Sequence, residues 1–322
     1  MYPMESASPS SCFTTRGGIA VTRTACPADP VGAVESLIDA IDQRRGALYA
    51  SMVDQPGRYS RWTVGFVDPP LALSARGRSF RLDALNPRGA VLLTLLAEAV
   101  RTAPGIAECT VTEQAITGTI APATVVMREE ERSRQASVFS LVRAIMAAFA
   151  APDDAQLGLY GAFGYDLVFQ FEAMQQRLER AANQRDVVLY LPDTLLVVDH
   201  ARQSAEELLY EFAGQGLSTD GMPRVSLPAP FRPASRDAAV VSDHEPGAYA
   251  ATVELARGAF ARGDLFEAVM SQTFSTPCTQ APAALFRRLR ETNPAPYGAL
   301  INLGDGEFLV SASPEMFVRV QG

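Results

Sequence analysis

The sequence contains no lysine. All 28 basic residues are arginine, and 36 acidic residues bring the net charge to −8. A chain without lysine cannot form a Schiff base through a side-chain amine, attach pyridoxal phosphate or complete a P-loop. The arginines are scattered and the overall balance is acidic, so we expect no nucleic-acid partner. Genomic base composition is the simplest reason for the missing lysine.

Histidine and cysteine are also scarce. The two histidines, His200 and His244, are expected on the surface or in turns. The cysteines form no C-x-x-C pair and no zinc-ligand spacing is present, so no metal site is predicted in this chain. Free thiols are expected rather than disulfides in an intracellular protein of this size. The cysteines are Cys12, Cys26, Cys109 and Cys278.

Long apolar runs are missing as well. No run of about 18 apolar residues occurs, so no membrane span is expected. Residues 1–18 lack the basic start and apolar stretch of a signal peptide, which makes a cytoplasmic location the default expectation. With 322 residues, of which 48% are hydrophobic, the chain is long enough for roughly two domains.

Apolar residues recur at helical spacing in several segments. The first helix is predicted to begin at Asp29-Pro30, because aspartate caps free amides and proline suits the first turn. Its end is predicted near Gly46. The other helices are predicted over residues 88–102, 137–150, about 246–263 and 282–290.

Short runs of β-branched and aromatic residues predict strands. Two lie within residues 186–200, on either side of Pro192, and a hairpin is predicted around residues 304–306. Alternation of strands and helices favours an α+β (mixed α/β) fold. Residues 213–246, rich in glycine, proline and serine, are interpreted as a linker. The remaining strands are predicted over residues 47–53, 64–67, 71–77 and 265–275, with the hairpin strands at 297–303 and 307–311 and a strand pair over 311–320.

A glycine-rich segment, GLYGAFGYDLVFQFE, occupies residues 158–172. Its glycines are spaced as G-x-x-G-x-x-G, which is not the dinucleotide fingerprint, and no βαβ unit surrounds them. Close packing of a glycine-rich strand or helix face is the favoured interpretation. Asp166 and Glu172 are accordingly expected to be structural rather than catalytic.

The loop NPAPYG, residues 293–298, is predicted to be rigid. Two prolines fix two φ angles and remove two amide donors, and Pro296 biases Ala295 toward extended geometry. A rigid loop beside an aromatic ring suits recognition of the ammonium and carboxylate groups of an amino acid. Its simpler interpretation is a structural turn from a helix into a strand.

Three segments carry a resemblance to a known family: GDLFEAVMSQ at 263–272, NPAPYG at 293–298 and SASPEMFVRV at 311–320. Together they resemble the opening of the chorismate-binding domain of anthranilate synthase component I, the large subunit. The resemblance covers about residues 13–320, and residues 158–172 look like a segment of the family's N-terminal domain. Residues 46–77 look most like members fused to a glutamine amidotransferase.

The resemblance implies a tryptophan feedback site. One wall of that site is expected from the NPAPYG loop, at Pro296, Tyr297 and Gly298. The other is expected from a strand that reads LLES in the family and LYAS here, so that Ser51 matches the serine. Ala50 stands where many members carry glutamate, so one acidic partner for the ammonium group is missing.

The resemblance also implies what this stretch lacks. The family's catalytic residues and magnesium ligands belong to motifs expected beyond residue 322, so no catalytic residue is predicted here. The expected layout is an N-terminal component I-like domain over 1–212, a linker over 213–246 and the incomplete start of the chorismate-binding domain over 247–322. Expected partners are chorismate, tryptophan as inhibitor, and a glutamine amidotransferase, separate or fused.

Alternatives remain within and outside the enzyme class. Aminodeoxychorismate synthase and the phenazine-pathway homologue share the fold and are the enzyme alternatives. A non-catalytic fragment that binds tryptophan is the alternative from another class. Continuation of the natural protein past Gly322 into magnesium and histidine motifs would favour an enzyme.

Overall fold

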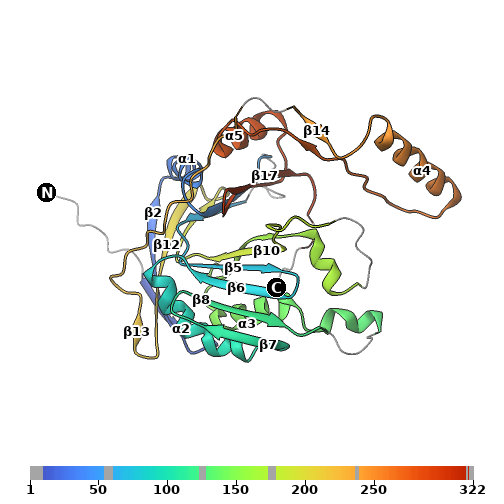
Figure 1. The fold of residues 1–322 in the computed structure, drawn as a ribbon. Helices are drawn as coiled ribbons and strands as arrows, with labels where there is room; N and C mark the ends of the chain where they lie inside the picture. The colour runs from blue at the N-terminus through green and yellow to red at the C-terminus, as the bar shows by residue number, and fades with distance from the viewer. Residues whose placement is uncertain are drawn as a thin grey trace. The chain divides into compact units, whose positions relative to one another are not determined.

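The computed structural model describes residues 10–53, 61–122, 128–172, 179–235, 239–316 and 318. It divides into two compact units. The first comprises residues up to Pro230 together with those from Pro282 onward, and the second comprises Phe231–Ala281. Both units are drawn in Figure 1.

The larger sheet of the first unit contains nine strands among the described residues, in the order β1-β2-β12-β11-β4-β3-β16-β17, with β13 paired to β12. All its pairs are antiparallel. The strands are β1 (Ser10–Thr14), β2 (Ala20–Ala28), β3 (Gly46–Ala50), β4 (Trp62–Val67), β11 (Thr194–Asp199), β12 (Ser204–Gly214), β13 (Leu217–Ser218), β16 (Tyr297–Gly304) and β17 (Glu307–Ser313).

The smaller sheet is also antiparallel, in the order β7-β8-β6-β5-β10-β9 across the part of the chain that the structure describes. Its strands are β5 (Leu71–Arg76), β6 (Ser79–Ala84), β7 (Ile106–Val111), β8 (Ala115–Ile120), β9 (Tyr160–Phe163) and β10 (Val187–Leu191). Helices beside antiparallel sheets make an α+β fold, as the sequence predicts.

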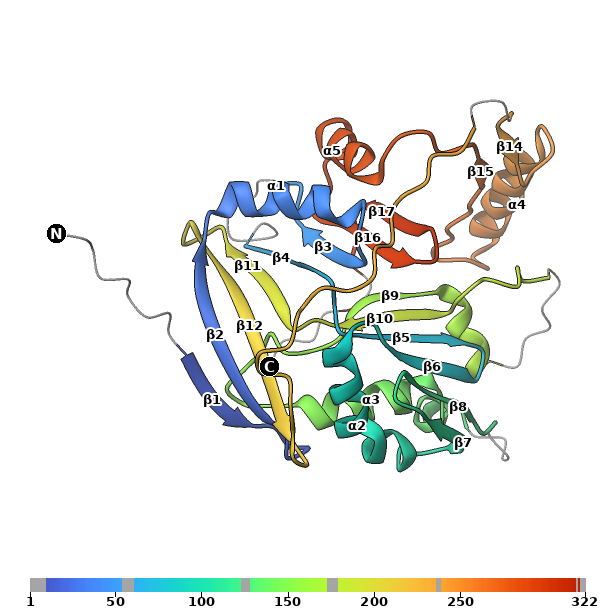
Figure 2. The same cartoon turned by 60° about the vertical axis from the view of Figure 1, so that its left-hand side comes forward.

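The two sheets stack with helices on their outer sides (Figure 2). Helices α1 and α5 cover the outer face of the larger sheet, and α2 and α3 lie below the smaller one. The helices of the first unit are α1 (Pro30–Ile41), α2 (Pro87–Arg101), α3 (Val138–Phe149) and α5 (Pro282–Thr292), with 3-10 turns η1 (Glu129–Arg134) and η2 (Tyr165–Gln170).

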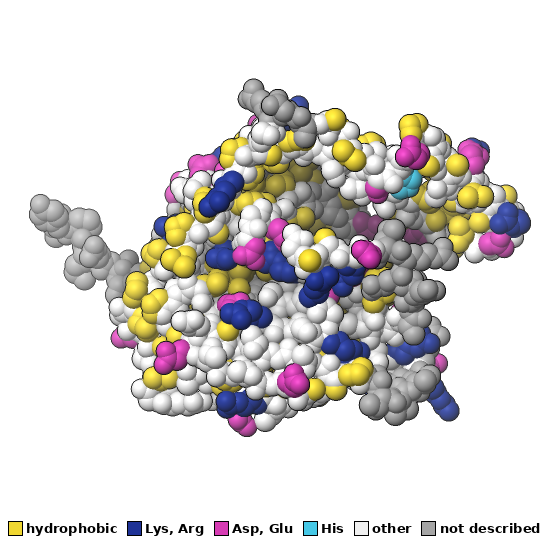
Figure 3. Space-filling model, viewed as in Figure 1, with side chains coloured by type: hydrophobic (Ala, Val, Ile, Leu, Met, Phe, Trp, Pro, Cys, Tyr) yellow, Lys and Arg dark blue, Asp and Glu magenta, His cyan; other side chains and the backbone are white. Residues whose placement is uncertain are grey.

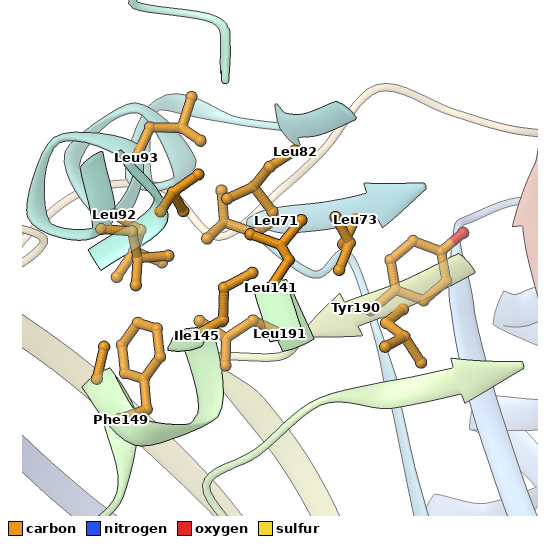
Figure 4. Packing of buried hydrophobic residues seen from close by; sticks show 14 of the residues in the cluster. Leu71, Leu73, Leu82, Leu92, Leu93, Leu141, Ile145, Phe149, Tyr190 and Leu191 are labelled. Carbon is orange, nitrogen blue, oxygen red and sulfur yellow. The ribbon is translucent and has the colours of Figure 1, made fainter. Parts of the chain in front are cut away.

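The main hydrophobic core lies between the smaller sheet and helices α2 and α3 and continues to the inner face of the larger sheet. Figure 4 shows leucines of α2 and apolar side chains of α3 directed toward strands β5, β6 and β10. A second cluster lies between α1, α5 and the outer face of the larger sheet, and includes Ile38, Phe286 and Leu300. The larger sheet is therefore buried on both faces around β3 and β16.

Helix α1 begins as predicted. The Asp29 carboxylate accepts hydrogen bonds from the amides of Val31 (3.4 Å) and Gly32 (2.8 Å), which satisfies two free donors of the first turn. The predicted end at Gly46 is wrong: the helix stops at Ile41, and Gly46 instead begins β3. There its Cα packs against the backbone of the neighbouring strand β4, where a side chain would not fit. The other predicted helices are present.

At two of the predicted strand breaks the chain crosses from one sheet to the other. The chain leaves β4 in the larger sheet and enters β5 in the smaller one across Pro69-Pro70. It returns from β10 to β11 across Pro192, the break predicted within residues 186–200. Proline cannot donate a ladder hydrogen bond, so each break frees the chain to change sheets. The predicted hairpin is present as β16 and β17.

The second unit contains α4 (Ala248–Arg262) and a short ladder of β14 (Val241–Ser242) with β15 (Phe274–Ser275). Helix α4 ends at Gly263, which adopts φ 78°. The strand predicted over 265–275 is wrong, because only β15 forms. Phe266 and Val269 are 98% and 88% exposed, so no neighbouring strand within the unit covers this apolar run.

Two further sequence expectations concern the chain's segments. Of the strand pair predicted over 311–320, the described part ends as a strand at Ser313, and residues 317 and 319–320 lie outside the described residues. Residues 213–230, expected as linker, pack within the first unit, where the Ala229 amide donates to Gln43 O (2.8 Å). The division into functional domains at 212 and 246 stays a prediction.

Arginine and acidic side chains are interspersed on the face drawn in Figure 3. This mixture agrees with the scattered arginines of the sequence. Within the described ranges, no helix is long and apolar enough to cross a membrane.

Arg88, at the start of α2, is completely buried. Its guanidinium pairs with Asp193 and donates to the carbonyls of Thr219 (2.8 Å) and Tyr210 (2.7 Å). Glu211 completes the cluster at 2.9 Å. The planar fork of arginine suits this many acceptors, and the contacts tie α2 to the β10–β11 crossing, to β12 and to the segment that follows it.

Replacing Arg88 by methionine should destabilise the fold by about 3–5 kcal/mol, because it leaves the buried Asp193 carboxylate with only the longer contact to Arg224 (3.3 Å). Chemical denaturation followed by circular dichroism measures the change. Arg257→Met is the matched control, because Arg257 pairs with Glu254 on the exposed surface of α4. Equal stabilities of the two variants would contradict the structural role of Arg88.

Strand β17 forms one edge of the larger sheet in the described part of the chain. Leu309 on this strand is 38% exposed. An uncovered apolar edge favours pairing with another chain, so we expect concentration-dependent self-association in size-exclusion chromatography with light scattering. Leu309→Lys should reduce it. A wild-type monomer at all concentrations, with β17 amides protected from exchange, would contradict this expectation.

Candidate functional site

The predicted site residues meet at the ends of β3 and β16. These strands pair antiparallel, and the pairing reaches Ala50 opposite Gly298. One step further, the amide of Met52 donates to the carbonyl of Ala295 (2.9 Å). Ser51 lies between these two contacts, so its backbone runs beside Pro296 and Tyr297. The structure thus brings together the two segments that the sequence places about 245 residues apart.

The NPAPYG loop joins α5 to β16. The last helical hydrogen bond runs from the Asn293 amide to Leu289 O (2.9 Å), after which Pro294 cannot continue the helix. Ala295 is 4% exposed and its carbonyl is held by Met52. The loop is therefore a tight connection between a helix and a central strand, as the structural interpretation of its sequence predicts.

Side chains of β3 alternate between the two faces of the sheet. Leu48, Ala50 and Met52 pack in the cluster beneath α1 and α5. Ala47 and Tyr49 pack on the opposite face, toward the smaller sheet. By the same alternation, Ser51 belongs to the face of Tyr49.

Strand β16 alternates in the same way. Leu300 packs beneath α1, whereas Ala299 and Ile301 face the smaller sheet. Tyr297 therefore shares the inner face with Ser51. A Cβ on Gly298 would approach Met52 Cε at 2.6 Å on the outer side, so Gly298 contributes only backbone to the inner face.

The Ser51 hydroxyl is partly exposed and engaged locally. It donates to Val53 O (3.2 Å) and accepts from the amide of Val53 (3.4 Å). Both contacts are long and lie at the surface side of the strand end. A hydroxyl in this state can be redirected to a carboxylate or an ammonium group at little cost.

Aromatic side chains fill the space between the sheets next to the site. Tyr49 and Tyr160 have ring centroids 6.3 Å apart, and Phe66 lies edge-on to Tyr160 at 5.9 Å. Burial raises the pKa of Tyr49, and raises that of Tyr160 to about 12. Both phenols are therefore neutral hydrogen-bond donors at physiological pH.

The glycine-rich segment packs against this aromatic group. Gly161, in β9, lies so close to β10 that a Cβ would come within 2.9 Å of Leu189 Cα. This is the close packing predicted for the segment. Asp166 pairs with Arg180 (2.8 Å) and Glu172 with Arg132 (2.7 Å), so both carboxylates have ion-pair partners.

His200 lies in a turn and His244 in a bend of the chain. His200 Nε2 lies 2.8 Å from Thr63 Oγ1. His244 lies in the second unit, where its Nδ1 is 2.5 Å from Asp243. Across the described ranges, no three histidine, cysteine or acidic side chains gather as metal ligands. The magnesium that the resemblance implies stays a prediction.

Comparison with known proteins gives the family. The model of chorismate binding enzymes matches residues 105–322, more than half of the chain. The chain belongs to the chorismate-binding enzyme family. This confirms the family resemblance of the sequence.

Two relatives of the chain are named as anthranilate synthases. The chain is 53% identical over 311 residues to an anthranilate synthase of Azospirillum brasilense, covering 96% of this chain and 42% of that protein. It is 30% identical over 266 residues to anthranilate synthase component 1 of Salmonella typhimurium, covering 79% of this chain and 50% of that protein. The chain thus spans half or less of the length of these relatives.

A relative with another product matches less of the chain. A 2-amino-4-deoxychorismate synthase of Streptomyces globisporus is 30% identical over 194 residues, covering 57% of this chain and 39% of that protein. This match is shorter than those to the two anthranilate synthases above. The binding roles of Ser51, Pro296, Tyr297 and Gly298 stay a prediction.

Proposed function

We propose that this chain is the part of an anthranilate synthase component I that carries the tryptophan feedback site and begins the chorismate-binding domain. The supporting observation is the 53% identity to an anthranilate synthase over 96% of the chain, together with the family match at residues 105–322. The adjacency of Ser51 and Pro296 supports the location of the feedback site.

The proposed reaction of the whole enzyme converts chorismate and ammonia to anthranilate, pyruvate and water. Ammonia adds to the chorismate ring, the ring hydroxyl is lost as water, and pyruvate is eliminated to leave the aromatic product. A glutamine amidotransferase would supply the ammonia, and magnesium would neutralise the substrate carboxylate. The role proposed for this chain in that reaction is binding and positioning.

In this proposal tryptophan binds on the inner face of the larger sheet, where β3 ends and β16 begins. The Ser51 hydroxyl can donate to its carboxylate or accept from its ammonium group. The preset NPAPYG backbone lowers the ordering cost of binding. Ala50 is apolar, so this position offers no acidic partner for the ammonium group, and affinity is expected to be modest.

Feedback requires that tryptophan prefers one arrangement of the protein over another. The site joins β3, early in the chain, to β16, which lies within the match to chorismate binding enzymes. Binding at this junction can therefore bias how the two segments pack. The same proposal includes a cytoplasmic location, which rests on the family resemblance.

An aminodeoxychorismate synthase is the second enzyme candidate, supported by the shorter match to the Streptomyces relative. A tryptophan-binding fragment without catalysis is the candidate from another class. Product analysis separates the first two, and tryptophan binding without turnover is the signature of the third.

We expect the 322-residue chain alone to make no anthranilate from chorismate, ammonium and magnesium, because no catalytic motif is predicted in it and its described residues gather no metal ligands. Anthranilate fluorescence measures the product, with a complete anthranilate synthase as the positive control. Fluorescence above the protein-free blank would contradict this expectation.

Replacing Ser51 by phenylalanine should fill the proposed site and weaken tryptophan binding about tenfold or more. Isothermal titration calorimetry measures the affinity, and thermal melting checks that the fold is kept. Ser79→Phe is the control, since Ser79 is an exposed strand serine in the smaller sheet. Equal tryptophan affinity of the Ser51 variant and the wild type would place the site elsewhere.

A further inference from the structure

Two tyrosine hydroxyls join the sheets of the first unit in opposite directions. Tyr49, on β3 of the larger sheet, donates to the Gly161 carbonyl on β9 of the smaller sheet (3.1 Å). Tyr190, on β10 of the smaller sheet, donates to the Asn302 carbonyl on β16 of the larger sheet (2.9 Å). Each phenol crosses the space between the sheets to reach a strand carbonyl.

A continuous group of rings connects these two hydrogen bonds. Phe66 lies 5.9 Å from Tyr160 and 6.0 Å from Tyr190, in both cases edge-on, and Tyr160 lies 6.3 Å from Tyr49. Edge-to-face packing fixes ring orientation in addition to burying apolar area. The two tyrosines are thus chemically similar members of one buried structure, which makes each a natural control for the other.

Their positions relative to the proposed amino-acid site differ. Tyr49 stands two residues before Ser51 on the same face of β3, directly opposite Ala299 in the ladder. Tyr190 contacts β16 at Asn302, toward the other end of that strand. Only the first of these two hydrogen bonds can set the shape of the site directly.

The Tyr190 end of the group is held by additional contacts. The side-chain amide of Asn302 donates to the carbonyls of Ile41 (2.9 Å) and Ala229 (2.8 Å). Its side-chain oxygen accepts from the backbone amide of Gly304 (3.0 Å). Loss of the Tyr190 hydroxyl would therefore leave β16 in place.

We propose that Tyr49 is a positioning residue of the amino-acid site and forms its aromatic inner wall. This rests on the proposed function. The hydrogen bond from the Tyr49 hydroxyl to the Gly161 carbonyl fixes the ring and ties β9 to β3, two residues before Ser51. The ligand class that such a wall favours is an L-amino acid with an aromatic side chain, because rings pair edge-on or offset with an aromatic ligand.

The position is informative because the family motif has an apolar aliphatic residue there. In LYAS, Tyr49 stands at the second leucine of LLES. Burial raises the pKa of Tyr49, so its hydroxyl remains protonated. It donates its hydrogen to the Gly161 carbonyl. Phenylalanine keeps the ring and removes the bond, which leaves the Gly161 carbonyl without this partner.

The experiment compares Tyr49→Phe with Tyr190→Phe in the 322-residue chain. Each variant loses one buried hydroxyl that bridges the sheets, so both should lower the melting temperature by similar amounts. Calorimetric titration with L-tryptophan should show affinity weakened about five- to tenfold in Tyr49→Phe and changed less than about twofold in Tyr190→Phe. Tyr49→Leu, which also removes the ring, should weaken binding further.

The outcomes separate two claims. If the wild type binds tryptophan and the Tyr49 and Tyr190 variants bind it with equal affinity, the role of Tyr49 is overturned. The proposed function is unaffected by that result. Absence of binding by a folded wild-type chain would overturn the proposed tryptophan site and the role of Tyr49 with it. A melting loss without an affinity loss in Tyr49→Phe would identify it as structural only.

Discussion

The pairing of β3 with β16 is the constraint on which the rest of the first unit depends. It places residues 46–50 beside residues 298–302 and makes the late hairpin part of the larger sheet. The same pairing fixes the place of helix α5, which packs on the outer face of these strands. Its Arg287 and Arg290 pair with Glu35 of α1 at 2.9 Å each. Without this pairing Ser51 and the NPAPYG loop would have no reason to meet.

Arginine supplies the polar side chains that hold this arrangement. Arg185 donates to Leu303 O (3.0 Å) and to Asp305 (3.2 Å) and pairs with Glu307, so one guanidinium stabilises the hairpin turn. Arg88 stabilises the β10–β11 crossing in the same way, by pairing with Asp193. In a chain without lysine, forked donors replace point charges, and each buried one satisfies several acceptors at once.

The sequence predicts the elements better than their partners. Helices with clear caps and periodicity, and the hairpin with its glycine turn, are found where predicted. The strands β1, β2, β6, β7, β8 and β12 are missed. Leu208, Tyr210 and Phe212 alternate as in a half-buried strand, but the two adjacent glutamates before them obscure this pattern. The adjacency of Ser51 to Pro296 came from resemblance, because strand pairing over such a separation is not encoded locally. Tyr49 was missed, since its role appears only when two sheets stack.

The most direct test of the proposed site is a crystal structure of the chain with L-tryptophan. We expect the amino acid to lie on the inner face of the larger sheet, with its polar groups at Ser51 and the NPAPYG backbone and its ring beside Tyr49. Tryptophan bound on the α1 side of the sheet, or at a place remote from β3 and β16, would contradict it.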